Sequence, residues 1–125
     1  MTRVSVIGCG NMGGAFLRGL ARTGSYHLTA IDLDPEALEA VEADASETAG
    51  DIAAAKDSDI VILAVKPGVV EAVLDDLDLS ADQTLLTLAA GVSRGFVADR
   101  TEATVVRIMP NLAAETGDMA AAATE

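Results

Sequence analysis

Short blocks of apolar and polar residues alternate along the chain, and the blocks follow two different periodicities. Continuous apolar, β-branched runs predict buried strands. Between them, apolar residues recur at the spacing of three and four that lines one face of a helix. The runs predict strands over 3–8, 27–32, 59–65, 84–90 and 104–109, and the spaced positions predict helices over 11–22, 34–43, 68–77 and 95–100.

Some of these elements carry further signals. The predicted apolar faces are Phe16, Leu17 and Leu20 in the first helix and Val69, Val70, Val73, Leu74 and Leu77 in the third. Asp34 precedes Pro35, an arrangement that favours a capped helix start with proline at its first position. Residues 45–50 are ambiguous and compatible with a short edge strand, and residues 51–56 fit a short helix.

This alternation of strands and helices predicts an α/β fold with a Rossmann-type, doubly wound and mostly parallel sheet. A chain of 125 residues without internal repeats or a linker is expected to form one domain, here residues 1–125. The ligand site of such a sheet lies at the carboxyl ends of its strands.

Three glycines stand where the first strand meets the first helix. Gly8, Gly10 and Gly13 give the spacing GxGxxG directly after the strand. In this context the first glycine permits a sharp turn, the second lets backbone approach a pyrophosphate, and the third lets helix and strand pack closely. Packing alone is the alternative interpretation of the same glycines.

Asp32 supports the interpretation as a nucleotide site. It ends the second predicted strand, 22 positions after Gly10, where such sites place an acid that accepts from the adenosine ribose. A solvated turn residue is the alternative. A carboxylate repels a 2′-phosphate, and the segment Asp32-Leu33-Asp34 offers no basic partner for one, so NADH is favoured over NADPH.

The charge of the chain excludes several classes of partner. Twenty acidic residues face eight basic ones, which gives a net charge of −12. No basic surface is available for nucleic acid or for an anionic membrane. An ordinary soluble surface explains the acidity. Adaptation to molar salt also explains it, because the ions screen the repulsion between the acidic side chains. The scarcity of lysine and of aromatic residues favours the second explanation.

Two further features predict a cytoplasmic protein. No apolar run approaches the ~18 residues that span a bilayer, and the N-terminus lacks the profile of a signal peptide. The single cysteine, Cys9, cannot form an internal disulfide. No metal site is predicted.

Four segments together resemble the pyrroline-5-carboxylate reductases. They are IGCGNMGGA at 7–15, AVKPGVVEAVL at 64–74, AAGVS at 89–93 and RIMPN at 107–111. Their order and spacing match across essentially the whole chain. The resemblance implies reduction of the C=N bond of 1-pyrroline-5-carboxylate, an imino acid, by NAD(P)H to give proline.

The resemblance also implies where ligands bind. With Asp32, the expected cofactor-binding residues are Ile7, Gly8, Cys9, Gly10, Asn11, Met12, Gly13, Ala64, Val65, Lys66, Pro67, Ala89, Ala90 and Gly91. Lys66 and Asn111 are the candidates near the nicotinamide, Lys66 as a cation for the substrate carboxylate or the cofactor. No residue is an evident acid for protonating the imine. Cys9 and His27 are not expected to be catalytic.

The chain departs from the family pattern in two residues and in length. Asp51 replaces a frequent Asn near the adenosine end, which again disfavours a 2′-phosphate, and Leu112 replaces the Thr that commonly follows Met-Pro-Asn. The resemblance also implies a helical C-terminal domain, which makes the dimer and much of the substrate site in the family, and we expect that these 125 residues do not include it. We therefore expect cofactor binding with little turnover, and oligomers only with that domain.

Two other functions remain open. One is a related hydride-transfer domain of the deazaflavin-dependent NADP reductase or β-hydroxyacid dehydrogenase type. The other is a dinucleotide-binding module without enzymatic activity. Val65-Lys66-Pro67 together with Met109-Pro110-Asn111 favours the reductase over both.

Overall fold

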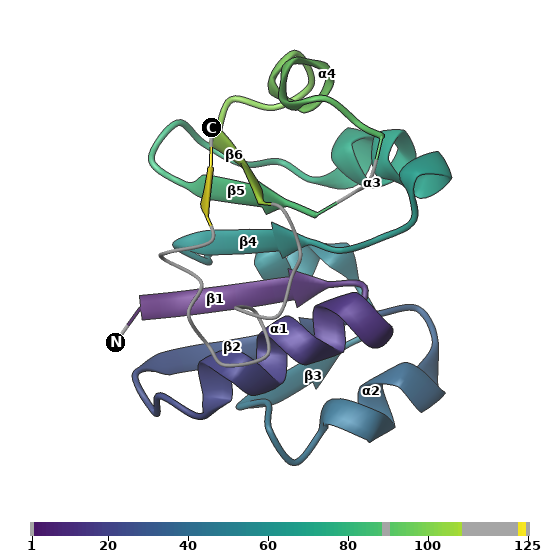
Figure 1. Cartoon of the computed structure of the whole chain (residues 1–125), viewed down its shortest axis with the longest axis vertical. Coiled ribbons are helices and arrows are strands. Elements are labelled where there is room, and N and C mark those ends of the chain that lie inside the picture. The colour runs from purple at the N-terminus through teal and green to yellow at the C-terminus, as the bar shows by residue number, and fades with distance from the viewer. Residues whose placement is uncertain (1, 89–90, 109–122, 125) are drawn as a thin grey trace.

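The described residues fold around one β-sheet. The computed structural model describes residues 2–88, 91–108 and 123–124, and within them the sheet has seven strands in the order β3-β2-β1-β4-β5-β6-β7 (Figure 1). The strands are β1 (Thr2–Ile7), β2 (Tyr26–Ile31), β3 (Glu47–Ala49), β4 (Ile60–Leu63), β5 (Thr84–Thr87), β6 (Thr104–Ile108) and β7 (Ala123–Thr124). β1 to β6 pair in parallel and β7 pairs antiparallel with β6, so the predicted doubly wound, mostly parallel sheet is confirmed.

Helices cover both faces of this sheet. They are α1 (Asn11–Ala21), α2 (Pro35–Val41), α3 (Val70–Asp76) and α4 (Arg94–Ala98), with 3₁₀ turns η1 (Ile52–Ala55) and η2 (Pro67–Val69). Successive residues of a strand point to opposite faces. Val4 and Val6 of β1 accordingly pack in the core under α1 and α2, whereas Ile7 joins the core under η1, α3 and α4.

The predicted helix signals hold in the first half of the chain. Phe16, Leu17 and Leu20 are buried, as the helical spacing indicated. Asp34 caps α2, its carboxylate accepting from the Glu36 N–H at 3.0 Å. The ambiguous segment 45–50 contributes the edge strand β3.

The third predicted helix is wrong at its start. Residues 67–69 form the 3₁₀ turn η2, and the α-helix begins only at Val70. Pro67 fixes the backbone at the first position of this turn and has no N–H to donate. Val69 therefore does not join the buried face but remains 45% exposed, whereas Val70, Val73, Leu74 and Leu77 are buried as predicted.

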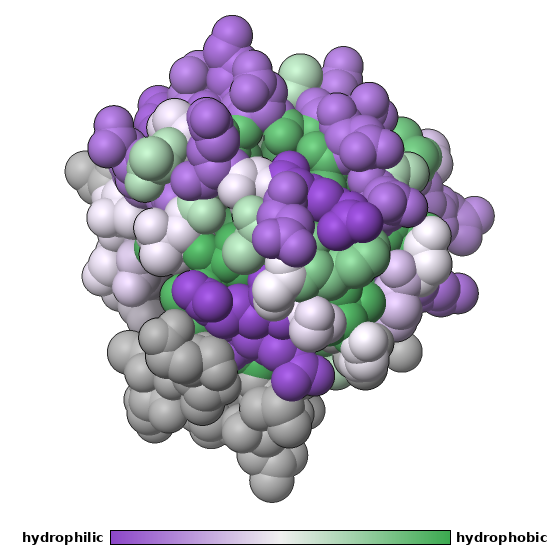
Figure 2. Space-filling view, turned by 90° about the horizontal axis from the view of Figure 1, so that it is seen from above, coloured by the Kyte–Doolittle hydropathy of each residue, from purple (hydrophilic) through white to green (hydrophobic). Residues whose placement is uncertain are grey.

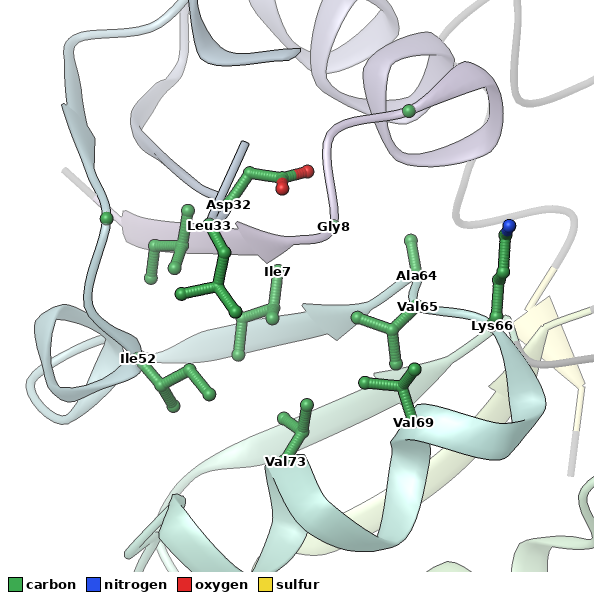
Figure 3. Close-up of a pocket in the computed structure, with 13 residues that line it drawn as sticks. Ile7, Gly8, Asp32, Leu33, Ile52, Ala64, Val65, Lys66, Val69 and Val73 are labelled. Atoms are coloured by element: carbon green, nitrogen blue, oxygen red, sulfur yellow. The ribbon is translucent and has the colours of Figure 1, made fainter. Parts of the chain in front are cut away.

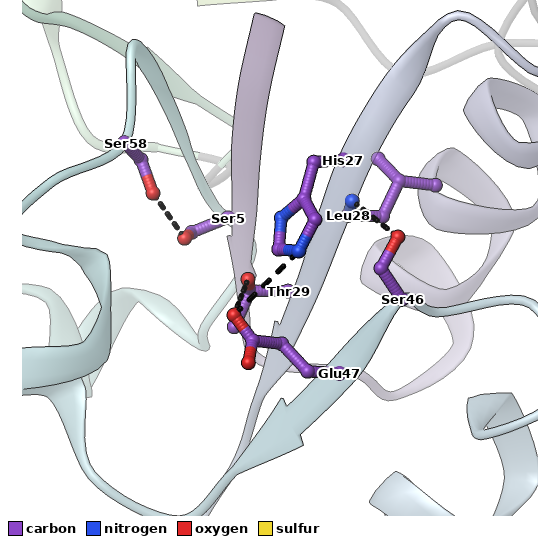
Figure 4. A network of polar contacts seen from close by, with 7 residues as sticks. All are labelled: Ser5, His27, Leu28, Thr29, Ser46, Glu47 and Ser58. Carbon is purple, nitrogen blue, oxygen red and sulfur yellow. Dashed lines mark hydrogen bonds and ion pairs between the residues drawn. The ribbon is translucent and has the colours of Figure 1, made fainter. Parts of the chain in front are cut away.

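Side-chain hydrogen bonds tie β3 to its neighbour. Thr29 donates to the Glu47 carboxylate at 3.3 Å, and the Leu28 N–H donates to the Ser46 hydroxyl at 3.0 Å (Figure 4). His27 lies 3.8 Å from Glu47, measured from Nε2 to Oε1. These contacts hold the short strand at the edge of the sheet.

Candidate functional site

The turns that follow β1 and β4 meet at the point where the sheet reverses its order. From β1 the chain proceeds to β2 and β3 on one side, then crosses to β4 on the other. Open α/β sheets bind their ligands at such a crossover. A cavity of about 320 Å³ opens there (Figure 3).

The three glycines of the first turn have three different surroundings. Gly8 has a φ of +91°, and a Cβ on it would lie 2.9 Å from the Ala64 carbonyl group. A Cβ on Gly13 would overlap the Gly8 carbonyl oxygen, whereas a Cβ on Gly10 would meet nothing within 4 Å. The first glycine thus serves the turn, the third serves close packing of α1, and the second leaves open space at the mouth of the site.

The amino end of α1 opens into that space. Gly10 is the N-cap residue and supplies no side-chain cap to the helix. The first intrahelical bond runs from the Gly14 N–H to the Gly10 carbonyl at 2.8 Å. Amides of the first turn have no carbonyl partner within the helix, so this end suits an anion.

Asp32 lies beside this turn and is hydrogen-bonded through both oxygens. Its Oδ2 accepts from the Cys9 N–H at 2.7 Å and its Oδ1 accepts from the Asp34 N–H at 2.9 Å. Each carboxylate oxygen has a further lone pair, so both remain able to accept from a ligand hydroxyl. Among the residues that line the cavity, Asp32 and Lys66 are the charged ones, and Figure 3 shows them on opposite sides of Gly8.

Apolar residues form the cavity walls. Leu33 and Ile52 contribute one side, and Val69 and Val73 contribute the other (Figure 3). Leu33 is 85% exposed although it is large and apolar. Such walls favour a ligand with an apolar part, whose binding would cover the exposed leucine.

Several sequence-predicted site residues come together here. The predicted residues that line the cavity are Ile7, Gly8, Gly10, Asp32, Ala64, Val65 and Lys66. Gly13 is buried beneath the turn, while Met12, Pro67 and Gly91 are exposed outside the lining, and Asn11 is the first residue of α1. Ala89, Ala90 and Asn111 lie outside the described residues.

The cavity is also lined by residues that the sequence did not predict as site residues. These are Ile31, Leu33, Gly50, Ile52, Val69 and Val73. Leu33 alone had a readable signal, since it is an apolar residue between two acids after a strand. Asp51 is close in sequence but does not line the cavity: its carboxylate accepts from the Ala53 N–H at 2.9 Å and caps η1.

The side chains of Cys9 and His27 do not line the cavity. Cys9 is 3% exposed, and its Sγ lies 3.6 Å from the carbonyl oxygens of both Val6 and Ile31. His27 is near the amino end of β2, opposite the carboxyl ends where the cavity opens. Within residues 2–88, 91–108 and 123–124 there is no group of three side chains suited to a metal ion.

The Cys9 thiol is expected to react slowly. Burial, and secondarily the charge of Asp32, raises its pKa from 9.0 to about 11. At pH 8 the thiolate fraction is then roughly a hundredfold below that of an unperturbed thiol. We expect the rate with Ellman's reagent to fall at least that far below the rate of the urea-unfolded chain, and to rise about tenfold per pH unit toward pH 11. A rate that levels off near pH 9 would contradict this.

Comparison with known proteins adds three findings. Residues 3–91 match a family model described as NADP oxidoreductase, coenzyme F420-dependent. The chain is 35% identical to a pyrroline-5-carboxylate reductase from Mycobacterium leprae over 129 residues, which cover 94% of this chain and 44% of that protein. It therefore spans about half the length of the curated relatives it matches.

Solved structures give the same result. A pyrroline-5-carboxylate reductase from Coxiella burnetii has a TM-score of 0.80 at 25% identity, and the match covers 91% of this chain and 46% of that one. Another from Streptococcus pyogenes has a TM-score of 0.76 at 31% identity, and the match covers 90% of this chain and 44% of that one.

None of the helices in the described part of the chain is long and apolar enough to cross a membrane.

Proposed function

The chain belongs to the family described as coenzyme F420-dependent NADP oxidoreductase, an NAD(P)-binding domain, and on that premise we propose that it is the cofactor-binding half of a reductase that converts 1-pyrroline-5-carboxylate to proline. The observation that carries the cofactor part is the Gly8–Gly13 turn with Asp32 beside it at the crossover of the sheet. The relatives' names support the substrate part.

The residues present fit a dinucleotide. Gly10 and the first-turn amides of α1 would hold the pyrophosphate, because no Cβ blocks their approach and the helix end favours an anion. Asp32 would accept from the adenosine ribose. The apolar walls formed by Leu33, Ile52 and Val73 would enclose the adenine.

The chain's own chemical contribution is binding and orientation. A bound reduced nicotinamide supplies hydride for the reduction of a C=N bond. Lys66 lies on the far side of Gly8 from Asp32, so its ammonium group would meet the nicotinamide half of the cofactor or the carboxylate of the substrate. Asn111 is proposed as a second contact there, on the resemblance alone.

Asp32 also gives the site a preference for NADH. At about 4 Å and an effective dielectric near 20, a carboxylate and a phosphate charge repel by about 4 kcal/mol, and the partial exposure of Asp32 makes this an upper value. Asp51 adds less than its position in the sequence suggested, because it does not line the cavity. We expect NADH to bind more tightly than NADPH, and the difference to shrink in molar salt.

The acidic surface fits a cytoplasm of high salt. Hydrophilic residues surround smaller hydrophobic patches on the face shown in Figure 2. The net charge of −12 opposes folding through self-repulsion, which molar salt would screen. The cofactor titrations are therefore made both in dilute buffer and in molar KCl, with circular dichroism in each; equal stability in the two would favour an ordinary soluble surface.

Two measurements test the proposed function. NADH fluorescence is expected to rise on titration with the chain, which contains no tryptophan to interfere. Oxidation of NADH dependent on 1-pyrroline-5-carboxylate is expected to be slight, because the chain covers only 44% of its M. leprae relative. Absence of NADH binding in both salts would refute the cofactor site, and robust turnover would refute the view that this is only the binding half.

The family description supports a second candidate, hydride exchange between NADP and a reduced deazaflavin. Asp32 makes this candidate less favourable, because a carboxylate at the ribose position repels the 2′-phosphate of NADP. A titration in which NADPH binds more tightly than NADH, followed by deazaflavin-dependent NADP reduction, would favour this candidate. A chain that binds NADH but reacts with neither substrate would be a binding module.

A further inference from the structure

The Asp32 carboxylate joins two loops without any ligand. It accepts from the Cys9 N–H in the glycine turn and from the Asp34 N–H at the start of α2. Asp32 is itself fixed at the end of β2, where its own N–H donates to the Ala49 carbonyl at 3.2 Å. The carboxylate is therefore anchored to the sheet before it binds anything.

The contact with Cys9 is one of the restraints on the glycine turn, beside the Gly8 N–H, which donates to the Ile31 carbonyl at 2.8 Å. Cys9 stands between Gly8 and Gly10, and glycine is the residue with the widest choice of backbone conformation. The bond of 2.7 Å from its N–H to a charged oxygen is short, and such bonds are about twice as strong as neutral ones. The buried Cys9 side chain anchors the same residue from the other side.

We propose that Asp32 is a positioning residue for the glycine turn as well as the acceptor of the ribose: its hydrogen bond to Cys9 holds Gly10 and the start of α1 in the orientation that receives the pyrophosphate. This inference rests on the proposed function of the cavity. The turn and the ribose acceptor then form one preorganised unit. The affinity of the turn for the pyrophosphate and the affinity of Asp32 for the ribose therefore depend on each other.

A positioning role and a purely ribose-selecting role predict opposite changes in the affinity for NADPH when Asp32 is neutralised. If Asp32 only contacts the ribose and repels a 2′-phosphate, its neutralisation weakens NADH binding and strengthens NADPH binding. If Asp32 also positions the turn, neutralisation weakens both, because both dinucleotides share the pyrophosphate.

Asp32→Asn makes this distinction. The Cys9 and Asp34 N–H groups contact different carboxylate oxygens, whereas an amide has a single, uncharged acceptor oxygen, so Asp32→Asn loses one of the two contacts and weakens the other. Asp34→Asn is the matched control, since it removes the same charge two residues away and asparagine still caps α2. Asp32→Ser is a second neutral variant, used if Asp32→Asn does not fold.

The experiment has one arm without ligand and one with it. Amide hydrogen exchange at Cys9, measured by NMR on the free protein, is expected to be at least tenfold faster in Asp32→Asn than in Asp34→Asn and the parent chain. Fluorescence titration at fixed salt is expected to show Kd values for NADH and NADPH that both rise about tenfold or more in Asp32→Asn.

Other results separate this inference from the proposed function. Unchanged protection of Cys9, or NADPH binding that tightens while NADH binding weakens, would overturn the positioning role. A parent chain that binds neither dinucleotide would overturn the proposed function, and the exchange arm would still decide whether Asp32 holds the turn.

Discussion

Alanine in place of Gly13 is expected to lower the free energy of unfolding by about 3 kcal/mol or more, a large part of the total for a small domain. The new Cβ would overlap the Gly8 carbonyl oxygen and lie 2.9 Å from its carbon. Gly8 cannot retreat, because it is itself packed against the Ala64 backbone. In an open helix the same change would instead stabilise by about 1 kcal/mol.

Gly14→Ala is the matched control for this prediction. It lies one residue further along α1, and its Cβ would come closest to the Arg18 guanidinium, 3.2 Å away, which can move. We expect its stability to be unchanged or slightly higher. Urea unfolding followed by circular dichroism at fixed salt measures both variants. If the two midpoints coincide, the close packing of α1 on the first turn is wrong.

Serine in place of Gly10 is expected to leave folding intact and to weaken dinucleotide binding at least tenfold, whereas Gly13→Ala is expected to act on stability. Gly10 has a φ of −73° and open space at its Cβ position, and serine is a preferred N-cap residue. Stability should therefore hold or improve. The same open space is where the pyrophosphate would approach the backbone, so a side chain there obstructs the ligand.

Gly95→Ser serves as the control for Gly10→Ser. Gly95 lies in α4, outside the cavity lining, and a Cβ on it also meets nothing within 4 Å. Thermal unfolding and NADH titration of both variants separate folding from binding. NADH affinity in Gly10→Ser equal to that in Gly95→Ser would show that the ligand does not pass over Gly10.

The sequence predicted those parts of the fold that are encoded locally. The buried face of α1 and the Asp34 cap follow from residues whose neighbours in sequence are also their neighbours in structure. The parallel sheet pairs residues far apart in the chain, and it was predictable from the alternation of strands and helices. The start of α3 was missed because apolar spacing registers burial and not the type of turn. Pro67 allowed a 3₁₀ turn that leaves Val69 at the cavity.

The candidate site also has one part that the sequence predicted and one part that it did not. That the glycine turn and Asp32 lie together was predictable, because a fixed spacing in the sequence carries this arrangement. The walls were not, since Leu33, Ile52 and Val73 come from three separate segments of the chain, and their sequence patterns match those of ordinary core or surface residues. No pattern in the sequence indicates that the Asp32 carboxylate also binds the Cys9 amide.

The short strand at one border of the sheet bears on how the protein behaves at high concentration. Half of the residues are apolar and the mean hydropathy is +0.36, values that ordinarily warn of aggregation. An exposed sheet edge is the usual template for it. Here β3 offers only three residues for pairing, and two of them are exposed and polar, Glu47 and Thr48. A border this brief and charged gives a second molecule little to extend, so fibrous self-association should not begin there.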